Sequence, residues 1–161
     1  MTRGDKQVGA LCLRMTRRGL LRVLLVTSRD TGRWVIPKGW PMTGLDDPAA
    51  AAVEALQEAG VSGRIEFASA GTYRYVKADV AVDKPLSVTV YRLWVETQGR
   101  RWPERAARKR RWFTIARAAA LVAEPELAAL IAAHADLESK HAHRVKPRRK
   151  VARVRAPASP L

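Results

Sequence analysis

The stretch GWPMTGLDDPAAAAVEALQEAGV, residues 39–61, decides the fold of this chain. Asp47 is a good N-cap, and Pro48 suits a first helical turn, where its missing N–H would have no partner. Four alanines follow, and alanine has the highest helix propensity. Gly60 then supplies the left-handed residue that ends many helices. The stretch therefore predicts a glycine loop followed by a helix over residues 48–59.

The predicted helix carries two acidic residues, Glu54 and Glu58, at i, i+4 spacing. Their Cβ atoms lie roughly 5–6 Å apart on one face, where like charges repel each other weakly. Acidic side chains that face a glycine-rich turn can hold a divalent cation against a phosphate. The alternative is a solvated acidic face on an alanine-rich helix, and the surrounding segment decides between the two.

The whole segment favours the cation site, because it resembles the Nudix box. The pattern of that box is Gly, five residues, Glu, seven residues, then Arg-Glu-hydrophobic-any-Glu-Glu-any-Gly-hydrophobic. Aligned without gaps, it matches at Gly39, Glu54, Glu58, Gly60 and Val61, and more loosely at Ala55. Three positions depart from the pattern: Leu45 and Gln57 replace glutamates, and Val53 replaces the arginine.

Two segments outside the box add to this resemblance. RWVIPKG at residues 33–39 and RRWFT at residues 110–114 look like the diphosphoinositol polyphosphate phosphohydrolase branch of the Nudix hydrolase family. The resemblance covers roughly residues 8–135. It implies an α/β fold, the α/β/α sandwich with a mixed β-sheet.

The resemblance also implies an activity and a set of site residues. The activity is metal-dependent cleavage of a diphosphate linkage in a nucleoside diphosphate derivative or another phosphate-rich small molecule, with Mg²⁺ or Mn²⁺. Glu58 is expected as a metal ligand, Glu54 as a second ligand or the general base, and Gly39 as a carbonyl ligand. Gln57 can offer the metal a neutral oxygen but no charge. Because the box departs at three positions, a weak or inactive module that binds nucleotide, polyphosphate or nucleic acid is the alternative.

Groups outside the helix are needed to hold phosphate. Lys38 and Arg33 flank the glycine loop, and the basic cluster at residues 100–111 includes Arg108 and Arg110. The planar guanidinium of arginine suits phosphate. The alternative for the cluster is an exposed loop on a basic protein.

Other residues are candidates for completing the site. An acid such as Glu96 or Glu104 could complete the metal shell, because the box lacks one glutamate where the pattern has a pair. Trp40, beside the first glycine of the box, is the candidate for an aromatic contact with substrate. Packing in the core is the alternative for this tryptophan.

Composition agrees with one compact domain. The chain has 161 residues, of which 47% are hydrophobic, and this is enough for a core. No apolar run approaches the ~18–20 residues that span a bilayer, so no membrane insertion is expected. The first residues show no secretion signal, and the lone Cys12 fits a reducing compartment, which together predict a cytoplasmic protein. Cys12 itself falls in an alternating strand pattern and is expected to be buried.

The chain is strongly basic, with 30 Lys and Arg against 15 Asp and Glu and a net charge of +15. Residues 137–161 form a tail with prolines and no apolar periodicity, which predicts disorder. Such basic arms can contact nucleic acid or polyphosphate through counterion release, whereas a solubilising tail is the alternative. The expected organisation is an N-terminal extension over residues 1–7, a Nudix hydrolase domain over residues 8–136 and this tail.

The remaining elements follow from apolar periodicity. Strands are expected at residues 8–15, 20–27, 33–36, 65–77 and 86–96, with a loop at residues 78–85. Thr114 is expected to cap a helix over residues 115–122. Glu124 and Pro125 are expected to begin a last helix that ends near residue 135.

Overall fold

The computed structural model of the chain describes residues 4–76 and 85–138, which form one mixed sheet with helices on both faces. The strands of this part are β1 Lys6–Met15, β2 Leu21–Thr27, β3 Trp34–Val35, β4 Lys38–Gly39, β5 Val61–Tyr75, β6 Leu86–Gln98 and β7 Arg110–Thr114. The helices are α1 Asp47–Ala59, α2 Ile115–Leu121 and α3 Pro125–Ala132. The strand order is β3-β2-β1-β6-β5, with β4 on β1 and β7 on β2. Only β1 and β6 are parallel among these pairs, which confirms the predicted α/β fold with a mixed sheet.

Strand β1 shares one edge between two partners. Its C-terminal half pairs with β2, whereas nearer its start Val8 lies opposite Gly39 and Gly9 opposite Lys38 of β4. The Ala10 amide also donates to the Pro37 carbonyl at 2.9 Å. This pairing fixes the backbone at the start of the glycine loop to the central strand of the sheet.

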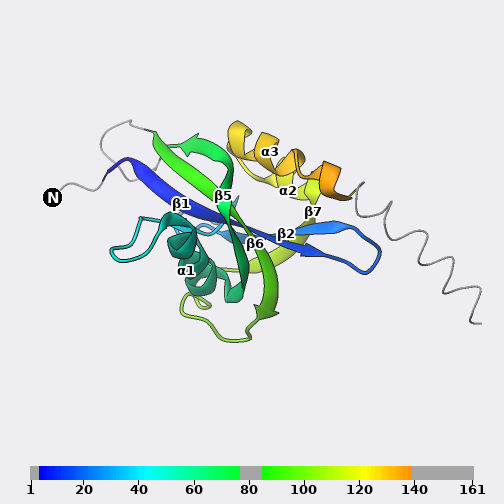
Figure 1. Cartoon of the computed structure of the whole chain (residues 1–161), viewed down its shortest axis with the longest axis horizontal. Helices are drawn as coiled ribbons and strands as arrows, with labels where there is room; N and C mark the ends of the chain where they lie inside the picture. Colours follow the sequence, from blue (N-terminus) through cyan, green and yellow to red (C-terminus); the bar gives the residue numbers. More distant parts are fainter. Residues whose placement is uncertain (1–3, 77–84, 139–161) are drawn as a thin grey trace, which may run out of the picture.

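Alternating side chains divide the core into two layers. Leu11 and Leu13 of β1 belong to the cluster that includes residues of α2 and α3, whereas Ala10 and Cys12 belong to the cluster that includes the alanines of α1. Figure 1 shows α1 on one side of the sheet and α2 with α3 on the other. The division follows from the two-residue period of a strand. Cys12 is fully buried, as predicted, and burial raises the pKa of its thiol to about 12.

Helix α1 packs on the sheet through small side chains. Its fully buried residues are Ala50, Ala51, Ala55 and Ala59. Because alanine adds little bulk, the helix can lie close to the strands. Glu54 and Glu58 are buried with them, which is unusual for acidic side chains.

The strands differ from the sequence prediction at several ends. β1 begins at Lys6, two residues early, and β5 begins at Val61, directly after the C-cap of α1. The clearest correction is β7, a strand that the apolar periodicity does not predict. Trp112 of this strand lies opposite Leu24 of β2. Pairing with β2 therefore forms the strand, although two successive arginines interrupt the apolar alternation that would predict it.

The last helices follow the prediction more closely. Thr114 caps α2, and its hydroxyl accepts a hydrogen bond from the Arg117 amide at 3.1 Å. α3 follows Glu124 as expected but ends at Ala132, earlier than predicted. Residues 78–84 of the predicted loop and residues 139–161 of the predicted tail lie outside the described residues. In the part that the structure describes, no helix is long and apolar enough to cross a membrane.

Candidate active site

The caps of α1 set the position of its acidic face. The N-cap is Asp46 rather than the predicted Asp47, because Asp46 has the extended backbone of a cap and its Oδ1 accepts from the Ala49 amide at 2.9 Å. Asp47 is therefore the first helical residue. Gly60 ends the helix in the left-handed conformation, with φ of 68°, as predicted. Its amide donates hydrogen bonds to carbonyls of the last turn, so both ends of the helix are capped.

Glu54 and Glu58 lie together between α1 and the sheet. Their exposed fractions are 9% and 5%, and their side chains are hydrogen-bonded to each other. The Lys38 amide donates to Glu58 Oε1 at 3.3 Å. The Glu54 carboxylate lies so close to Gly39 that a Cβ at that position would overlap it. The structure therefore brings together three of the predicted site residues, Gly39, Glu54 and Glu58.

Burial makes both carboxyl groups hard to ionise. It raises the pKa of Glu58 to about 8, although the Arg108 guanidinium acts in the opposite direction. It also raises the pKa of Glu54, against the effect of the hydrogen bond to Glu58. Two buried carboxyls in contact cannot easily carry two negative charges. Near neutral pH, both carboxyls of the pair can therefore ionise together only if additional positive charge is bound beside them.

Arg108 is a cation in direct contact with this pair. Its Nη2 lies 3.4 Å from Glu58 Oε2, and its Nε donates to Glu104 Oε1 at 2.9 Å. Its Nη1 donates to the Thr27 carbonyl at 3.0 Å. The Arg108 side chain is only 12% exposed. Arg108 therefore bridges Glu104 and the buried carboxyl pair.

The segment at residues 99–110 is held in place by the C-terminal end of α1. The last carbonyls of a helix have no partners within the helix. Here the bonds run from the Glu104 amide to Gln57 O (3.0 Å), Trp102 Nε1 to Glu58 O (3.0 Å), Arg110 Nη1 to Ala59 O (2.8 Å) and the Gly99 amide to Gly60 O (2.8 Å). Four successive carbonyls are therefore satisfied by one segment, and this positions Glu104 and Arg108 against the helix.

Lys38 lies at the other wall of the site. Its ammonium lies 4.8 Å from the centroid of the Tyr75 ring, and the Tyr75 hydroxyl donates to Gln7 Oε1 at 2.6 Å. Burial lowers the pKa of Lys38. Arg33 lies further out, with Nη1 3.7 Å from Glu124 Oε2, and lines a smaller cavity that also touches Lys38. Lys38 therefore lines this smaller cavity as well as the larger cavity beside Glu54 and Glu58.

These groups line an open cavity of about 510 Å³. Its lining includes Glu54, Glu58, Glu104, Lys38, Arg108 and Trp40. A cavity of this size and polarity can accept a small phosphorylated molecule. Within residues 4–76 and 85–138, no three His, Cys, Asp or Glu side chains are grouped so that they could hold a metal ion by themselves.

Residues 5–134 match the NUDIX domain family. The chain belongs to the Nudix family. A curated relative in this family is Nudix hydrolase 12, mitochondrial, of Arabidopsis thaliana, which is 35% identical over 103 residues. That match covers 59% of this chain and 49% of the relative, so the chain spans about half the length of the relative.

Solved Nudix structures have the same fold. The C. elegans Ap4A hydrolase in a binary complex has a TM-score of 0.61 at 21% identity, over 84% of this chain and 98% of that one. The NUDIX domain of Shewanella oneidensis NrtR complexed with ADP ribose has a TM-score of 0.59 at 16% identity, over 81% of this chain and 87% of that one. At such identities the similarity shows the Nudix fold alone.

Several residues predicted for the Nudix site do not reach the large cavity. Gln57 of the box is exposed and is absent from the lining. The Arg110 guanidinium is used for Ala59 O and Gly99 O and stacks on Trp102, 3.8 Å from the ring centroid, because the helix end needs donors there. Arg110 is therefore not placed to bind a phosphate in this cavity.

Of the two acids proposed from outside the Nudix box, the structure brings only one to the site. Glu104 lines the large cavity, whereas Glu96, near the end of β6, is exposed and absent from the lining. The spacing of Glu104 and Arg108, four residues apart, was the available sequence signal for this pair.

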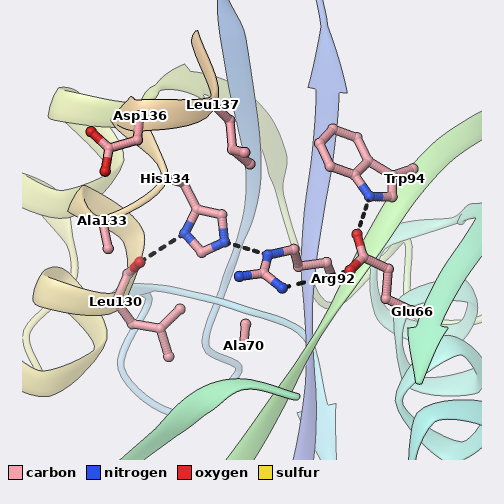
Figure 2. Close-up of a pocket in the computed structure, with 9 residues that line it drawn as sticks. All are labelled: Glu66, Ala70, Arg92, Trp94, Leu130, Ala133, His134, Asp136 and Leu137. Atoms are coloured by element: carbon pink, nitrogen blue, oxygen red, sulfur yellow. Dashed lines mark hydrogen bonds and ion pairs between the residues drawn. The ribbon is translucent and has the colours of Figure 1, made fainter. Parts of the chain in front are cut away.

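Another cavity, of about 390 Å³, lies on the face of the Nudix sheet that α3 covers (Figure 2). Arg92 Nε donates to His134 Nε2 at 2.8 Å, so the other ring nitrogen carries the proton and donates to Leu130 O at 2.8 Å. Glu66 lies 3.6 Å from Arg92 Nη1 and accepts from Trp94 Nε1 at 2.5 Å. Burial lowers the pKa of His134. These groups satisfy one another, so we assign them to holding the end of α3 on the sheet.

Proposed function

We propose that this Nudix domain is a metal-dependent pyrophosphohydrolase that cleaves a diphosphate linkage in a nucleoside diphosphate derivative or another phosphate-rich small molecule. One observation carries the proposal. The buried carboxyl pair of Glu54 and Glu58 lies beside Gly39 in a cavity whose other wall presents Lys38 and Arg108. Two carboxyl groups that can bind a divalent cation therefore lie opposite two positively charged side chains that can bind phosphate.

The donor set fits a divalent cation that is shared with substrate. Nudix hydrolases generally use divalent metals, typically Mg²⁺. Mg²⁺ takes one or two carboxylates, substrate phosphates and several waters, and Glu54 and Glu58 supply that number of carboxylates. The Gly39 carbonyl is the further ligand proposed from the chain. When bound, Mg²⁺ or Mn²⁺ would stabilise negative charge that develops on the phosphate oxygens.

The side chains of the cavity have separate tasks in this proposal. Arg108 offers a planar fork to a phosphate, and Lys38 offers a compact positive charge. Glu54 is the second carboxylate at the metal or the base that accepts the proton of the attacking water. Trp40, in the cavity lining, contacts the organic part of the substrate.

The substrate class is supported by charge and by relatives. Among the similar structures are an Ap4A hydrolase and a NUDIX domain complexed with ADP ribose. Nucleotides with a diphosphate linkage are therefore the first class to test. Inositol pyrophosphates are the second, because the diphosphoinositol polyphosphate phosphohydrolase branch remains a prediction from residues 33–39 and 110–114.

A binding module without turnover is the second candidate function. Two observations favour it: no three acidic or other metal-ligating side chains are grouped within the described ranges, and Gln57 is exposed. Contact of the basic tail, residues 137–161, with nucleic acid or polyphosphate belongs to this candidate as a prediction.

The decisive experiment is phosphate release from a substrate panel. The panel contains dinucleoside polyphosphates, nucleoside diphosphate sugars, ADP ribose, nucleoside triphosphates and inositol pyrophosphates, each with Mg²⁺, with Mn²⁺ and with EDTA. The proposal expects turnover of at least one diphosphate-linked compound, and that turnover must stop in EDTA. Tight binding of a compound without turnover in either metal would favour the binding module.

A further inference from the structure

We propose that Arg108 is an internal counter-ion of the buried carboxylates, which it holds in the metal-free protein and gives up to a divalent cation when a polyphosphate binds the guanidinium. The proposal rests on the proposed function, because it assumes that Glu58 is a metal ligand. It goes further by assigning to one side chain the coupling between metal binding and ligand binding.

Both oxygens of Glu58 have partners within the protein. Oε1 accepts from the Lys38 amide at 3.3 Å, and Oε2 lies 3.4 Å from Arg108 Nη2. A cation that binds Glu58 competes with these contacts for the carboxylate charge, and at Oε2 it meets the positive charge of the Arg108 guanidinium. The Lys38 amide belongs to β4, which is paired with β1, so its backbone is fixed. Arg108 is the partner that can leave, because only side-chain rotation is needed.

The guanidinium has two anchors other than Glu58. Its Nε bonds to Glu104 Oε1 and its Nη1 to the Thr27 carbonyl, at 2.9 and 3.0 Å. Neither contact involves Glu58. Because the guanidinium is planar and rigid, Nη2 leaves Glu58 only when one of these two bonds also loosens, and the other bond then keeps the side chain at the wall of the cavity.

A phosphate in the cavity supplies the replacement partner. Arginine binds phosphate oxygens with two parallel hydrogen bonds, which are stronger than one contact at 3.4 Å. The exchange then leaves Glu58 Oε2 open to a cation. Because coupling between two ligands is reciprocal, a polyphosphate must strengthen metal binding by the same factor by which the metal strengthens polyphosphate binding.

The test measures metal affinity rather than turnover. Binding of Mn²⁺ to the full chain is followed by electron paramagnetic resonance, with and without methylenediphosphonate, a diphosphate analogue that cannot be hydrolysed. Titrations of the analogue without protein correct for its own chelation of Mn²⁺. In the wild type, the analogue should raise Mn²⁺ affinity about fivefold or more, the lower range of measured couplings.

Arg108→Gln should bind Mn²⁺ alone about fivefold more tightly than wild type, and the effect of the analogue should largely disappear. Arg108→Lys, which keeps the charge without the fork, should change both quantities in the same direction by less and serves if the glutamine variant does not fold. Arg105→Gln removes an exposed positive charge from the same segment and should behave as wild type. Equal or weaker Mn²⁺ affinity in folded Arg108 variants would overturn the proposal.

A further variant separates this inference from the proposed function. If Glu58→Gln removes Mn²⁺ binding while the Arg108 variants bind Mn²⁺ as wild type does, the metal site stands and the counter-ion role fails. If Glu58→Gln leaves Mn²⁺ binding unchanged, the metal site of the proposed function fails as well.

Discussion

Two arginine-centred clusters lie on opposite faces of the same sheet, and their charges are balanced differently. Arg92 is matched by one carboxylate, Glu66, and by a neutral ring that accepts its hydrogen bond. Arg108 contacts Glu58 and Glu104, and Glu54 is hydrogen-bonded to Glu58. In the Arg92 cluster one guanidinium faces one carboxylate, whereas in the Arg108 cluster one guanidinium faces two carboxylates and a third carboxyl lies against one of them. That excess separates a candidate site from a group that holds elements together.

The strongest test of this difference is to remove one carboxyl from each cluster. Glu58→Gln should lower phosphate release about 10³-fold, because loss of charge stabilisation in an active site has effects of this order. Glu66→Gln should leave the rate within about twofold, since surface and supporting positions rarely act on the chemical step. Circular dichroism checks that both variants fold. A Glu58→Gln protein with wild-type turnover would contradict the assignment.

The excess of carboxyls should also be visible in the pH dependence of stability. The pKa of Glu58 is about 8 in the folded protein against an ordinary value of 4.5, so the unfolded chain ionises first. Its contribution to stability is therefore full below pH 4.5 and is lost as the pH rises towards 8. In EDTA at pH 9, Glu58→Gln should be more stable than wild type by a few kcal/mol, since one pKa unit corresponds to about 1.4 kcal/mol.

Urea unfolding at pH 5 and pH 9 measures this effect. The two proteins should differ little at pH 5, where Glu58 is mostly protonated in the folded state. If the difference in unfolding free energy between the two proteins is the same at pH 5 and pH 9, Glu58 ionises normally.

The Arg92 cluster should respond in stability alone. His134→Phe leaves Arg92 Nε without its acceptor and should cost about 1–3 kcal/mol of unfolding free energy, while Mn²⁺ affinity stays unchanged. The pKa of His134 is lowered from 6.5, so its contribution is present above pH 6.5 and is lost as the pH falls below it. The variant should therefore show a flatter decline of stability towards acid pH. A loss of Mn²⁺ affinity would mean that the two clusters are coupled.

The smallest effect is expected at the box position that lies outside the cavity. Gln57→Glu restores a glutamate of the Nudix pattern, but the side chain is exposed, where charge is screened by water. It should raise Mn²⁺ affinity by less than about threefold, because exposed charges interact weakly. Calorimetric titration compares it with wild type. A gain of tenfold or more would show that residue 57 turns into the site when a metal binds.

The sequence contains the local part of the site but not its long-range part. Glu54, Glu58 and Gly39 lie in one short segment, where helical spacing and a glycine loop place them together. The alternation of β1 likewise predicts a buried Cys12. Such features depend on neighbours within a few residues, which periodicity can capture.

Arg108 and Arg110 show what periodicity cannot capture. Both belong to one basic run, yet one faces the carboxylates and the other binds the end of α1. The difference depends on where the segment meets helix carbonyls more than 40 residues earlier in the chain, as in the pair Trp102 and Glu58 separated by 44 residues. Strand β7 was missed for the same reason, because its partner β2 is distant in sequence.

The attachment of residues 99–110 to the last carbonyls of α1 has a consequence for amide exchange. The Glu104 and Gly99 amides are donors to Gln57 O and Gly60 O, so solvent reaches them only when the helix end opens. Exchange at these two amides should therefore have one common opening free energy, as in a single cooperative unit. That same opening event would separate Glu104 and Arg108 from Glu58. Deuterium uptake at the Glu104 and Gly99 amides would thus report how often the candidate site opens transiently.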